Sequence, residues 1–360
     1  MTLTDKIKQR AYQTHQERID HLLLESITNH DTEGSNIQRL EKALSEYVGA
    51  DEAIVCNSQF NAFILIFMVL GLKAGDEVVT SPLSSGIAVQ AAIFMGAKVI
   101  FVDVDATRFT LDVEQVEDAI TERTKLIIPI SLLGNIADME RINALALQHD
   151  LCVIEDAAES FGGAYNGTKS TQLSKLATTS FYPSMPLHGF GNGAALFIED
   201  KELRAKARLI RSQGKKGMQY VSEGIEACMD PLQAAVVAFK LSILDEEITI
   251  RKDMAQKYAQ AFKDAPFHTP ALESESNFAY YPLLLKERAA FLRASQKEDI
   301  DLHIPFETPL HLHPAFAFMD YRKGDFPNSE TIAKQLLLLP LSAYLSEEEQ
   351  DKIINVLNML

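Results

Sequence analysis

The feature of this sequence that most constrains its fold is a regular alternation of apolar strand-like runs and helix-like segments, which begins at Ala53. Runs typical of strands read AIVC, EVVT, KVIFVDV, KLIIPIS and LCVIED, and segments with helical spacing lie between them at 60–72, 86–95, 113–120 and 138–148. Such alternation is typical of βαβ units in a mostly parallel sheet. The continuous apolar run from Leu126 to Ile130 indicates a sheet covered on both faces. We therefore predict an α/β fold with ligands at the carboxyl ends of its strands, where Asp156 lies.

Helical segments flank this region. An amphipathic helix is predicted over 4–27, followed by a second helix after Ser35, and Met229 to Phe262 is predicted to form one long helix or two. We predict a large domain over 1–240, including the N-terminal helical arm, and a small C-terminal α+β domain over 241–360. The small domain is expected to contain a strand at 280–285 and helices near 286–297, 329–337 and 346–357.

Charge and cysteine content exclude several functions. Lys and Arg total 34 against 50 Asp and Glu, a net charge of −16, which repels nucleic acids and anionic membranes. The three cysteines form no CxxC pair, and Cys56 and Cys152 are predicted to be buried thiols because they lie in apolar runs. The amino terminus is too polar for a signal peptide, and the longest apolar run, Ala62 to Leu72, is too short to span a bilayer. We expect a cytoplasmic protein.

The stretch 176–197, LATTSFYPSMPLHGFGNGAALF, has the character of an active-site loop between two buried strands. Tyr182-Pro183 interrupts the first strand, and three glycines (Gly189, Gly191 and Gly193) follow within five residues. Glycines let the backbone turn sharply or approach another group closely.

This stretch resembles the lysine-bearing loop of the DegT/DnrJ/StrS class of sugar aminotransferases. That loop has the form Ser-Phe-(Tyr/Phe)-Pro-(Ser/Thr)-Lys-x-Leu-Gly, and its lysine carries pyridoxal phosphate (PLP). The frame from Ser180 to Ser184 is intact here, but the lysine position holds Met185 and the glycine position holds His188. Methionine has no amine with which to form a Schiff base.

The resemblance extends over nearly the whole chain. GLKAGDEVVTSP, CVIEDAAESFGGAYNGTKS, MDPLQAAVVAFK and TPLHLHPAF are similar to segments of the same family. It implies a type I aminotransferase fold, with a mostly parallel sheet of the seven-stranded type. It also implies a homodimer with sites at the subunit interface, and a nucleotide-diphosphate sugar as substrate in surface-polysaccharide or deoxysugar biosynthesis.

Two groups of the family's cofactor pocket are retained. By the resemblance, Asp156 matches the aspartate that keeps the pyridinium nitrogen protonated, and Ser180 matches a serine that holds the phosphate. The family's Ser/Asn-Gly-Thr phosphate turn, by contrast, here reads Ser58-Gln59-Phe60-Asn61.

Other groups of that pocket are replaced. The stacking aromatic falls near Leu83 to Ser85, where there is none, the partner subunit's asparagine aligns with Glu226, and an arginine aligns with Cys228. A carboxylate about 4 Å from a phosphate costs on the order of 4 kcal/mol per unit pair. We expect no covalent cofactor, with noncovalent PLP or PMP as the alternative, and we expect Phe60 and Met185 to fill the vacated volume.

The candidate catalytic residues are His188, Asp156 and Glu159. A histidine near the operating pH suits acid–base catalysis, and two neighbouring carboxyls acquire separate pKa values. The alternatives are that His188 only packs or hydrogen-bonds, and that Glu159 is held in a salt bridge.

Candidate substrate ligands are Lys215 and Lys216, for a diphosphate, and His311. A solvated basic turn is the alternative for the lysines. His311 and His313 alternate in an extended segment, but the family has a histidine here without a metal, so we expect no metal site.

Three functions remain open. The first is a PLP-independent enzyme that modifies a nucleotide-linked keto- or aminosugar. The second is a non-catalytic protein that binds nucleotide sugar or pairs with an active paralogue. The third is an aminotransferase with noncovalent PLP, or a Lys-to-Met variant of one.

Overall fold

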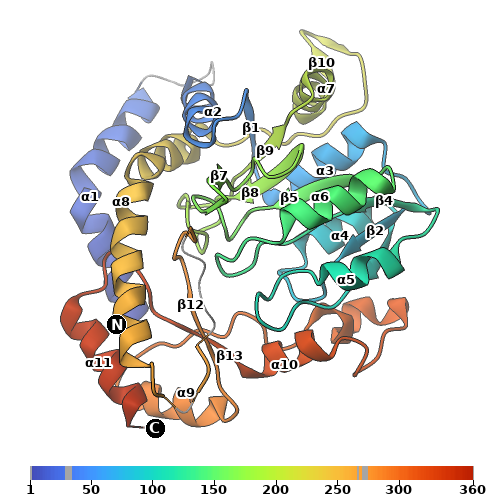
Figure 1. Ribbon diagram of the computed structural model, residues 1–360. Helices are drawn as coiled ribbons and strands as arrows, with labels where there is room; N and C mark the ends of the chain where they lie inside the picture. Colours follow the sequence, from blue (N-terminus) through green and yellow to red (C-terminus); the bar gives the residue numbers. More distant parts are fainter. Residues whose placement is uncertain (1, 29–34, 266, 270–274, 360) are drawn as a thin grey trace.

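A computed structural model describes residues 2–28, 35–265, 267–269 and 275–359 (Figure 1). Its centre is a seven-stranded sheet in the order β1-β9-β8-β5-β4-β2-β3. The strands are β1 (Ala53–Cys56), β2 (Glu77–Thr80), β3 (Lys98–Phe101), β4 (Thr124–Ile127), β5 (Cys152–Asp156), β8 (Leu176–Ser180) and β9 (Ala194–Ile198). Only β9 runs antiparallel to its neighbours in this sheet, β1 and β8. The predicted mostly parallel sheet is confirmed.

Helices cover both faces of the sheet, as the apolar strands predicted. They are α2 (Ser35–Val48), α3 (Gln59–Leu70), α4 (Ile87–Phe94), α5 (Val113–Val116), α6 (Met139–Gln148) and α7 (Lys201–Arg211). Successive side chains of a strand point to opposite faces. Val78 and Ile154 accordingly pack in the cluster that contains α3 and α4, whereas Val79 and Val153 pack in the cluster that contains α6.

The helices α3 and α8 (Pro231–Ala261) begin close to the carboxyl side of the sheet, and both have side-chain caps. Ser58 Oγ accepts a hydrogen bond from the Asn61 amide at 3.2 Å, and Asp230 Oδ1 accepts from the Leu232 amide at 2.8 Å. Each cap satisfies backbone N–H groups that the helix itself leaves unpaired. Gly71 ends α3 in the left-handed conformation, at φ 71°.

The helix α8 is one continuous helix of 31 residues, and it passes through residue 240. Its first half packs against α2, with Val237 and Leu241 in one cluster, and its second half contributes Tyr258 to the C-terminal cluster. The helix α1 (Leu3–Thr28) lies beside α8 in Figure 1, and Leu3 also joins the C-terminal cluster. The division at 240 stays a prediction, and one helix crosses it.

The C-terminal part is a small α+β unit. It contains the antiparallel pair β12 (Tyr281–Leu284) and β13 (Leu336–Leu339), the helices α9 (Arg288–Lys297), α10 (Pro327–Gln335) and α11 (Glu347–Asn358), and the short 3₁₀ helices η2 (Leu310–Leu312) and η3 (Pro314–Met319). The helix predicted over 329–337 was too long. Leu336 and Leu337 belong to a buried strand, because their backbone pairs with β12.

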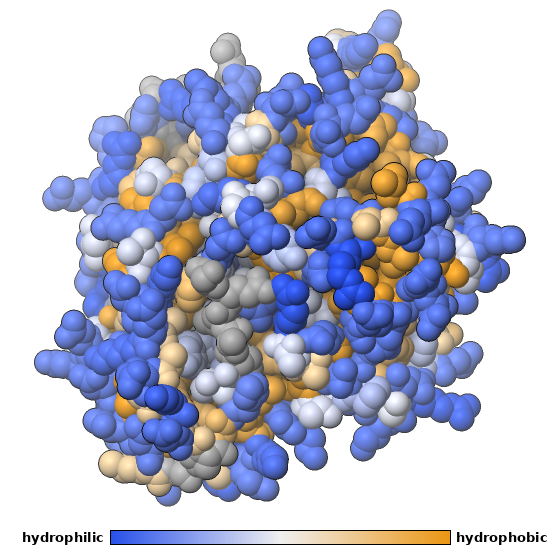
Figure 2. Space-filling model, viewed as in Figure 1, coloured by the Kyte–Doolittle hydropathy of each residue, from blue (hydrophilic) through white to orange (hydrophobic). Residues whose placement is uncertain are grey.

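The cysteines divide into one buried and two exposed thiols. Cys56 is fully buried, and burial raises its pKa to about 12. The prediction that Cys152 is buried was wrong, because this residue starts β5 at the exposed end of the strand. Hydrophilic side chains cover much of the face shown in Figure 2, with hydrophobic residues in patches between them. No helix in the described ranges is long and apolar enough to cross a membrane.

Candidate active site

Asp156 ends β5 at the carboxyl edge of the sheet, and its side chain is already engaged. Its Oδ1 accepts hydrogen bonds from Gln59 Nε2 at 2.7 Å and from the Ala158 amide at 3.1 Å. Gln59 also lies 3.5 Å from Thr178 Oγ1 on β8. Both Gln59 and Asp156 are buried, with 4% and 5% of their surface exposed. The side-chain amide in the first turn of α3 therefore occupies one oxygen, Oδ1, of the carboxylate that the resemblance places beside a pyridinium nitrogen.

A second carboxyl group, Glu159, lies in the turn that follows Asp156. Its Oε2 accepts a hydrogen bond of 2.8 Å from the Leu133 amide. Burial raises the pKa of Asp156 to about 6, and burial together with the nearby Asp156 charge raises the pKa of Glu159 to about 7. The expected salt bridge was wrong, since Glu159 forms no ion pair with a described residue and its partner is a backbone amide. That the two carboxyls act as a pair with separate pKa values stays a prediction.

The neighbouring Glu155 has a different role. It is fully buried and accepts hydrogen bonds from Ser170 Oγ at 3.0 Å and from the Thr171 amide at 2.9 Å. Burial raises its pKa to about 7. As the residue next to Asp156 in a strand, it points to the opposite face. Glu155 therefore holds the segment around 170 and stays away from the candidate site.

The loop after β8 folds back on itself in a tight turn. Ser180 is buried, and its Oγ accepts a hydrogen bond of 3.3 Å from the Tyr182 amide. The Met185 amide donates to the Tyr182 carbonyl at 2.9 Å. Met185 is half-buried and belongs to none of the hydrophobic clusters formed by the described residues. The expectation that Met185 supplies apolar filling is not supported.

Two glycines of this loop lie close to side chains at and just before the start of α8. A Cβ on Gly189 would lie 2.8 Å from Gln233 Oε1, and a Cβ on Gly193 would lie 2.7 Å from Met229 Cε. Gln233 Oε1 accepts a hydrogen bond of 2.8 Å from the Phe190 amide. The predicted close approach of another group is therefore present.

His188 forms a hydrogen bond within the loop. Its Nδ1 donates to the Met185 carbonyl at 3.1 Å, because a carbonyl oxygen only accepts. Burial, assisted by the nearby Lys240 charge, lowers the pKa of His188 to about 3. At neutral pH the ring is therefore uncharged and a weak base. The hydrogen-bonding alternative fits the structure, and a general acid–base role does not.

Phe60 does not fill the space above Asp156, so this prediction was wrong. Its ring packs edge-on against Phe94 of α4, with the ring centroids 5.8 Å apart. Successive residues of a helix point about 100° apart, so Gln59 and Phe60 cannot both face the sheet edge. The N-cap at Ser58 sets the helix phase so that Gln59 faces Asp156.

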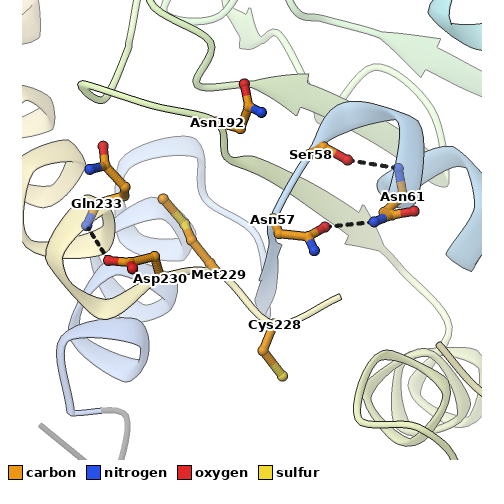
Figure 3. Close-up of a pocket in the computed structure, with 8 residues that line it drawn as sticks. All are labelled: Asn57, Ser58, Asn61, Asn192, Cys228, Met229, Asp230 and Gln233. Carbon is orange, nitrogen blue, oxygen red and sulfur yellow. Dashed lines mark hydrogen bonds between the residues drawn. The ribbon is translucent and has the colours of Figure 1, made fainter. Parts of the chain in front are cut away.

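A surface pocket of about 570 Å³ opens beside this site (Figure 3). It is lined by Asn57, Ser58, Asn61, Asn192, Cys228, Met229, Asp230 and Gln233. Asn61 Nδ2 donates to Asn57 Oδ1 at 2.7 Å, and Asn57 Nδ2 donates to the Glu226 carbonyl at 3.4 Å. Glu226 is itself exposed, so its carboxylate is free to face solvent or a second subunit. Its reach into a partner's site stays a prediction.

Lys215 and Lys216 lie in the short hairpin of β10 (Lys215–Lys216) and β11 (Gln219–Tyr220), which projects from the molecule near α7 (Figure 1). Lys215 Nζ lies 4.8 Å from the Tyr220 ring centroid. Their contact with a diphosphate stays a prediction.

His311 is a packing residue in this structure, which contradicts its prediction as a substrate ligand. Only 2% of its surface is exposed, and its Nε2 lies 3.2 Å from Glu330 Oε1. Its ring packs edge-on against Phe326 at 4.7 Å. His313 is exposed and bonds to the Thr308 carbonyl. No cluster of three metal-binding side chains occurs in the described part of the chain.

Sequence reasoning missed three features of the site: the hydrogen bond from Gln59, the amide-lined pocket, and Lys240. Lys240 Nζ lies 5.2 Å from the Phe190 ring centroid, and burial lowers its pKa to about 8. The only available signal for Gln59 was a glutamine at the family's glycine position. The pocket gave none, because its residues come from three separate segments.

These residues fit covalently bound PLP poorly. The amide of Gln59 already bonds one oxygen of the carboxylate that a pyridinium nitrogen would need, and Met185 offers no amine at the position that the resemblance assigns to the Schiff base. Glu159 adds a second ionisable carboxyl nearby. Only Asp156 and Ser180 retain the expected polar character.

Comparison with known proteins identifies the fold and family. The model of the "DegT/DnrJ/EryC1/StrS aminotransferase family" matches residues 13–358. The chain is 36% identical, over 315 residues and 87% of both chains, to UDP-2-acetamido-2-deoxy-3-oxo-D-glucuronate aminotransferase of Pseudomonas aeruginosa. It is 33% identical over 338 residues to GDP-perosamine synthase of Caulobacter vibrioides, covering 91% of this chain and 90% of that one.

Solved structures agree. A DegT DnrJ EryC1 StrS aminotransferase from Brucella abortus superposes with a TM-score of 0.92 at 33% identity, covering 96% of both chains. DesV of S. venezuelae, solved with a ketimine intermediate, superposes with a TM-score of 0.93 at 28% identity, covering 98% of this chain and 96% of that one. The fold is the type I aminotransferase fold, and the chain belongs to the DegT/DnrJ/EryC1/StrS aminotransferase family.

Proposed function

We propose that this chain binds a nucleotide-diphosphate sugar and acts on it, or presents it, without covalently bound PLP. The observation that carries the proposal is the 2.7 Å hydrogen bond from Gln59 Nε2 to Asp156 Oδ1. It gives one oxygen of the buried carboxylate, Oδ1, a neutral donor within the protein, so a pyridinium nitrogen would have to share or displace an existing hydrogen bond at that oxygen. Met185 at the Schiff-base position supports the same conclusion.

The substrate class follows from the relatives. The names of three of them specify a UDP-linked acetamido sugar, GDP-perosamine and a dTDP-linked amino sugar. The sugars and nucleotides differ, and the shared chemistry is a nucleoside diphosphate joined to a modified hexose. This chain covers most of each relative, which supports a role in nucleotide-sugar or surface-polysaccharide biosynthesis.

If the protein is an enzyme, Asp156 and Glu159 are its acid–base pair. Both pKa values lie near neutrality, so at neutral pH each group exists partly protonated and partly ionised. Such a pair can hold or transfer a proton beside a keto or hydroxyl group. His188, with a pKa near 3, does not belong to this machinery.

A thermal-shift comparison tests the proposal on purified protein. A UDP- or dTDP-linked sugar is expected to raise the melting temperature, whereas PLP is not, because bound ligand stabilises only the state that binds it. The absorbance spectrum should lack a PLP band, and borohydride should leave no reduced adduct on the chain. Stabilisation by PLP at least as large as that by any nucleotide sugar would overturn the proposal.

A noncovalent PLP enzyme is the second candidate, because Asp156 and Ser180 keep their places at the sheet edge. It predicts a yellow protein whose colour is lost on dialysis. A partner-subunit role predicts co-purification with an active paralogue, with no turnover by this chain alone.

A further inference from the structure

The pocket between α3 and α8 is lined mainly by neutral polar side chains, together with Cys228, Met229 and the carboxylate of Asp230. Figure 3 shows Asn57, Ser58 and Asn61 at one side of an open centre and Gln233 at the other. Asn192 enters from the glycine loop. A volume of about 570 Å³ is typical of small-molecule sites, which span roughly 300–1,000 Å³.

The pocket is not suited to a phosphate or another anion. No lysine or arginine is among its lining residues, and Asp230 contributes a carboxylate. The N-termini of α3 and α8 would otherwise attract anions. Here Ser58 already bonds the Asn61 amide, and Asp230 already bonds the amides of Leu232 and Gln233.

The amide side chains are held in place, with groups left for a ligand. Asn61 donates to Asn57 through one side-chain N–H, which leaves a second N–H and its Oδ1. Gln233 accepts from Phe190 through Oε1, which leaves two N–H donors on Nε2. An amide presents a donor and an acceptor side by side, and two neighbouring sugar hydroxyls offer the complementary pattern. Fixed side chains of this kind bind without a large ordering cost.

We propose that this pocket binds the hexose portion of the nucleotide sugar through Asn61, Asn192 and Gln233, with the diphosphate outside it. The inference rests on the proposed function and specifies its ligand subsite. A neutral, hydroxylated ring matches a lining of amides, one hydroxyl and one carboxylate, because sugar hydroxyls can donate to and accept from these groups. An aromatic base does not, because no aromatic side chain lines the pocket.

Cys228 provides a direct readout of occupancy. It lines the pocket and is exposed, whereas Cys152 is exposed at the amino end of β5 and Cys56 is buried. A ligand in the pocket covers Cys228 and leaves Cys152 open. The two thiols therefore act as probe and internal control in one molecule.

The experiment measures the rates at which a maleimide modifies Cys228 and Cys152, separated by peptide mass spectrometry. UDP-N-acetylglucosamine is the probe, with UDP and inorganic phosphate as controls. At ten times its dissociation constant the sugar nucleotide should slow modification of Cys228 about tenfold, since roughly one site in ten stays open. Modification of Cys152 should not change, and UDP or phosphate should protect Cys228 much less.

Variants locate the contact. Asn61→Leu and Gln233→Leu should each weaken protection by about tenfold or more in dissociation constant, the loss expected for one to two hydrogen bonds. Gln38→Leu, at an exposed position of α2 that lines a separate surface pocket, is the matched control and should leave protection intact.

The outcomes separate this inference from the proposed function. Thermal stabilisation by UDP-N-acetylglucosamine without protection of Cys228 overturns the subsite and leaves the proposed function standing. Equal protection by UDP overturns the hexose assignment. Modification of Cys228 only after denaturation also overturns it, because the pocket would then be closed in the assembled protein. If no nucleotide sugar stabilises or protects, the proposed function fails with it.

Discussion

The side-chain amide of Gln59 donates a 2.7 Å hydrogen bond to Asp156, and both residues are buried at the carboxyl edge of the sheet. The family resemblance places a glycine at the position of Gln59. A glycine leaves the carboxylate open, whereas the glutamine side chain supplies it with a neutral donor. The structure therefore has a donor at Asp156 Oδ1 that a glycine could not supply.

Removing the side-chain amide of Gln59 and placing a lysine at position 185 should allow the protein to bind PLP. Gln59→Gly combined with Met185→Lys is expected to bind PLP with an affinity at least tenfold higher than the unmodified protein, since a charged hydrogen bond is worth about 1.5–3 kcal/mol. The measurement is PLP absorbance during titration, followed by borohydride trapping.

The control for that change is Phe60→Ala with Met185→Lys, because Phe60 packs on Phe94 and not on Asp156. If both double variants bind PLP equally well, Gln59 does not exclude the cofactor.

Glu159→Gln should alter the pH dependence of stability. The folded-state pKa of Glu159 is raised to about 7 from an ordinary 4.5, so its contribution to stability is full below pH 4.5 and is lost as pH rises through 7. Glutamine still accepts from the Leu133 amide and carries no charge. The free energy of unfolding of the variant, relative to the unmodified protein, should therefore increase by about 1–2 kcal/mol between pH 5 and pH 8.

Denaturant titrations at the two pH values measure this difference. Glu122→Gln, at an exposed loop position, is the control and should show no such trend. If the difference in free energy of unfolding between Glu159→Gln and the unmodified protein is the same at pH 5 and pH 8, the carboxyl group of Glu159 does not titrate between these pH values.

Much of the fold could be predicted from the sequence because burial on both faces leaves a signature in every strand. Val78 and Val79 pack into opposite layers, so both had to be apolar. The C-terminal strand was harder, because the LLLL run at 336–339 continues a helical pattern and becomes a strand only through pairing with β12. The burial of Cys152 was predicted wrongly for a related reason, since an apolar run does not show which of its ends is exposed to solvent.

The candidate site could be located from the sequence, but its contacts could not. Asp156 was placed correctly because the carboxyl ends of parallel strands define the ligand edge. Which of Gln59 and Phe60 faces Asp156 depends on the phase of α3, and the N-cap at Ser58 sets that phase. The burial of His311 depends on Phe326 and Glu330, which the sequence does not show to be neighbours.

His188→Asn should reduce the loss of stability in mild acid. The folded-state pKa of His188 is lowered to about 3 from 6.5, so the stability associated with its neutral form is present above pH 6.5 and is lost as pH falls toward 3. Asparagine does not titrate and keeps an N–H donor for the Met185 carbonyl. We measure the free energy of unfolding of the variant minus that of the unmodified protein. This difference should be more favourable to the variant at pH 5 than at pH 7.5.

His21→Asn, on the exposed face of α1, is the comparison for that change. Nucleotide-sugar affinity and any turnover at neutral pH should be unchanged in His188→Asn. A large loss of turnover with normal affinity would restore His188 as an acid–base residue.

His311→Ala should destabilise the protein without weakening ligand binding. Its ring is buried against Phe326 and beside the partly buried Glu330, so truncation leaves a cavity and removes one neighbour of that carboxylate. The expected cost is about 2 kcal/mol in the free energy of unfolding. His313→Ala, at the exposed position two residues later, should cost less than about 0.5 kcal/mol. A drop in nucleotide-sugar affinity for His311→Ala at a temperature where it is fully folded would contradict the packing role.

The projecting hairpin of β10 and β11 exposes apolar side chains to water, which is unfavourable unless another surface covers them. Met218, Tyr220 and Val221 are 95%, 69% and 50% exposed, and they lie together at its tip and along its second strand. Grouped apolar side chains on a protrusion are typical of a subunit contact. We therefore expect the protein to sediment as a homodimer, at twice the 40.0 kDa of one chain.

Met218→Glu with Val221→Glu should shift the protein toward a monomer in sedimentation at micromolar concentration, because a buried unpaired carboxylate opposes association. Leu147→Glu on α6 is the control, since that side chain is 84% exposed and lies on a different element from the hairpin. Equal dissociation in both variants would indicate general destabilisation and contradict a hairpin contact. If Glu226, on the segment that follows the hairpin, reaches the neighbouring subunit's site as the resemblance implies, the monomeric variant should also lose nucleotide-sugar affinity while Leu147→Glu retains it.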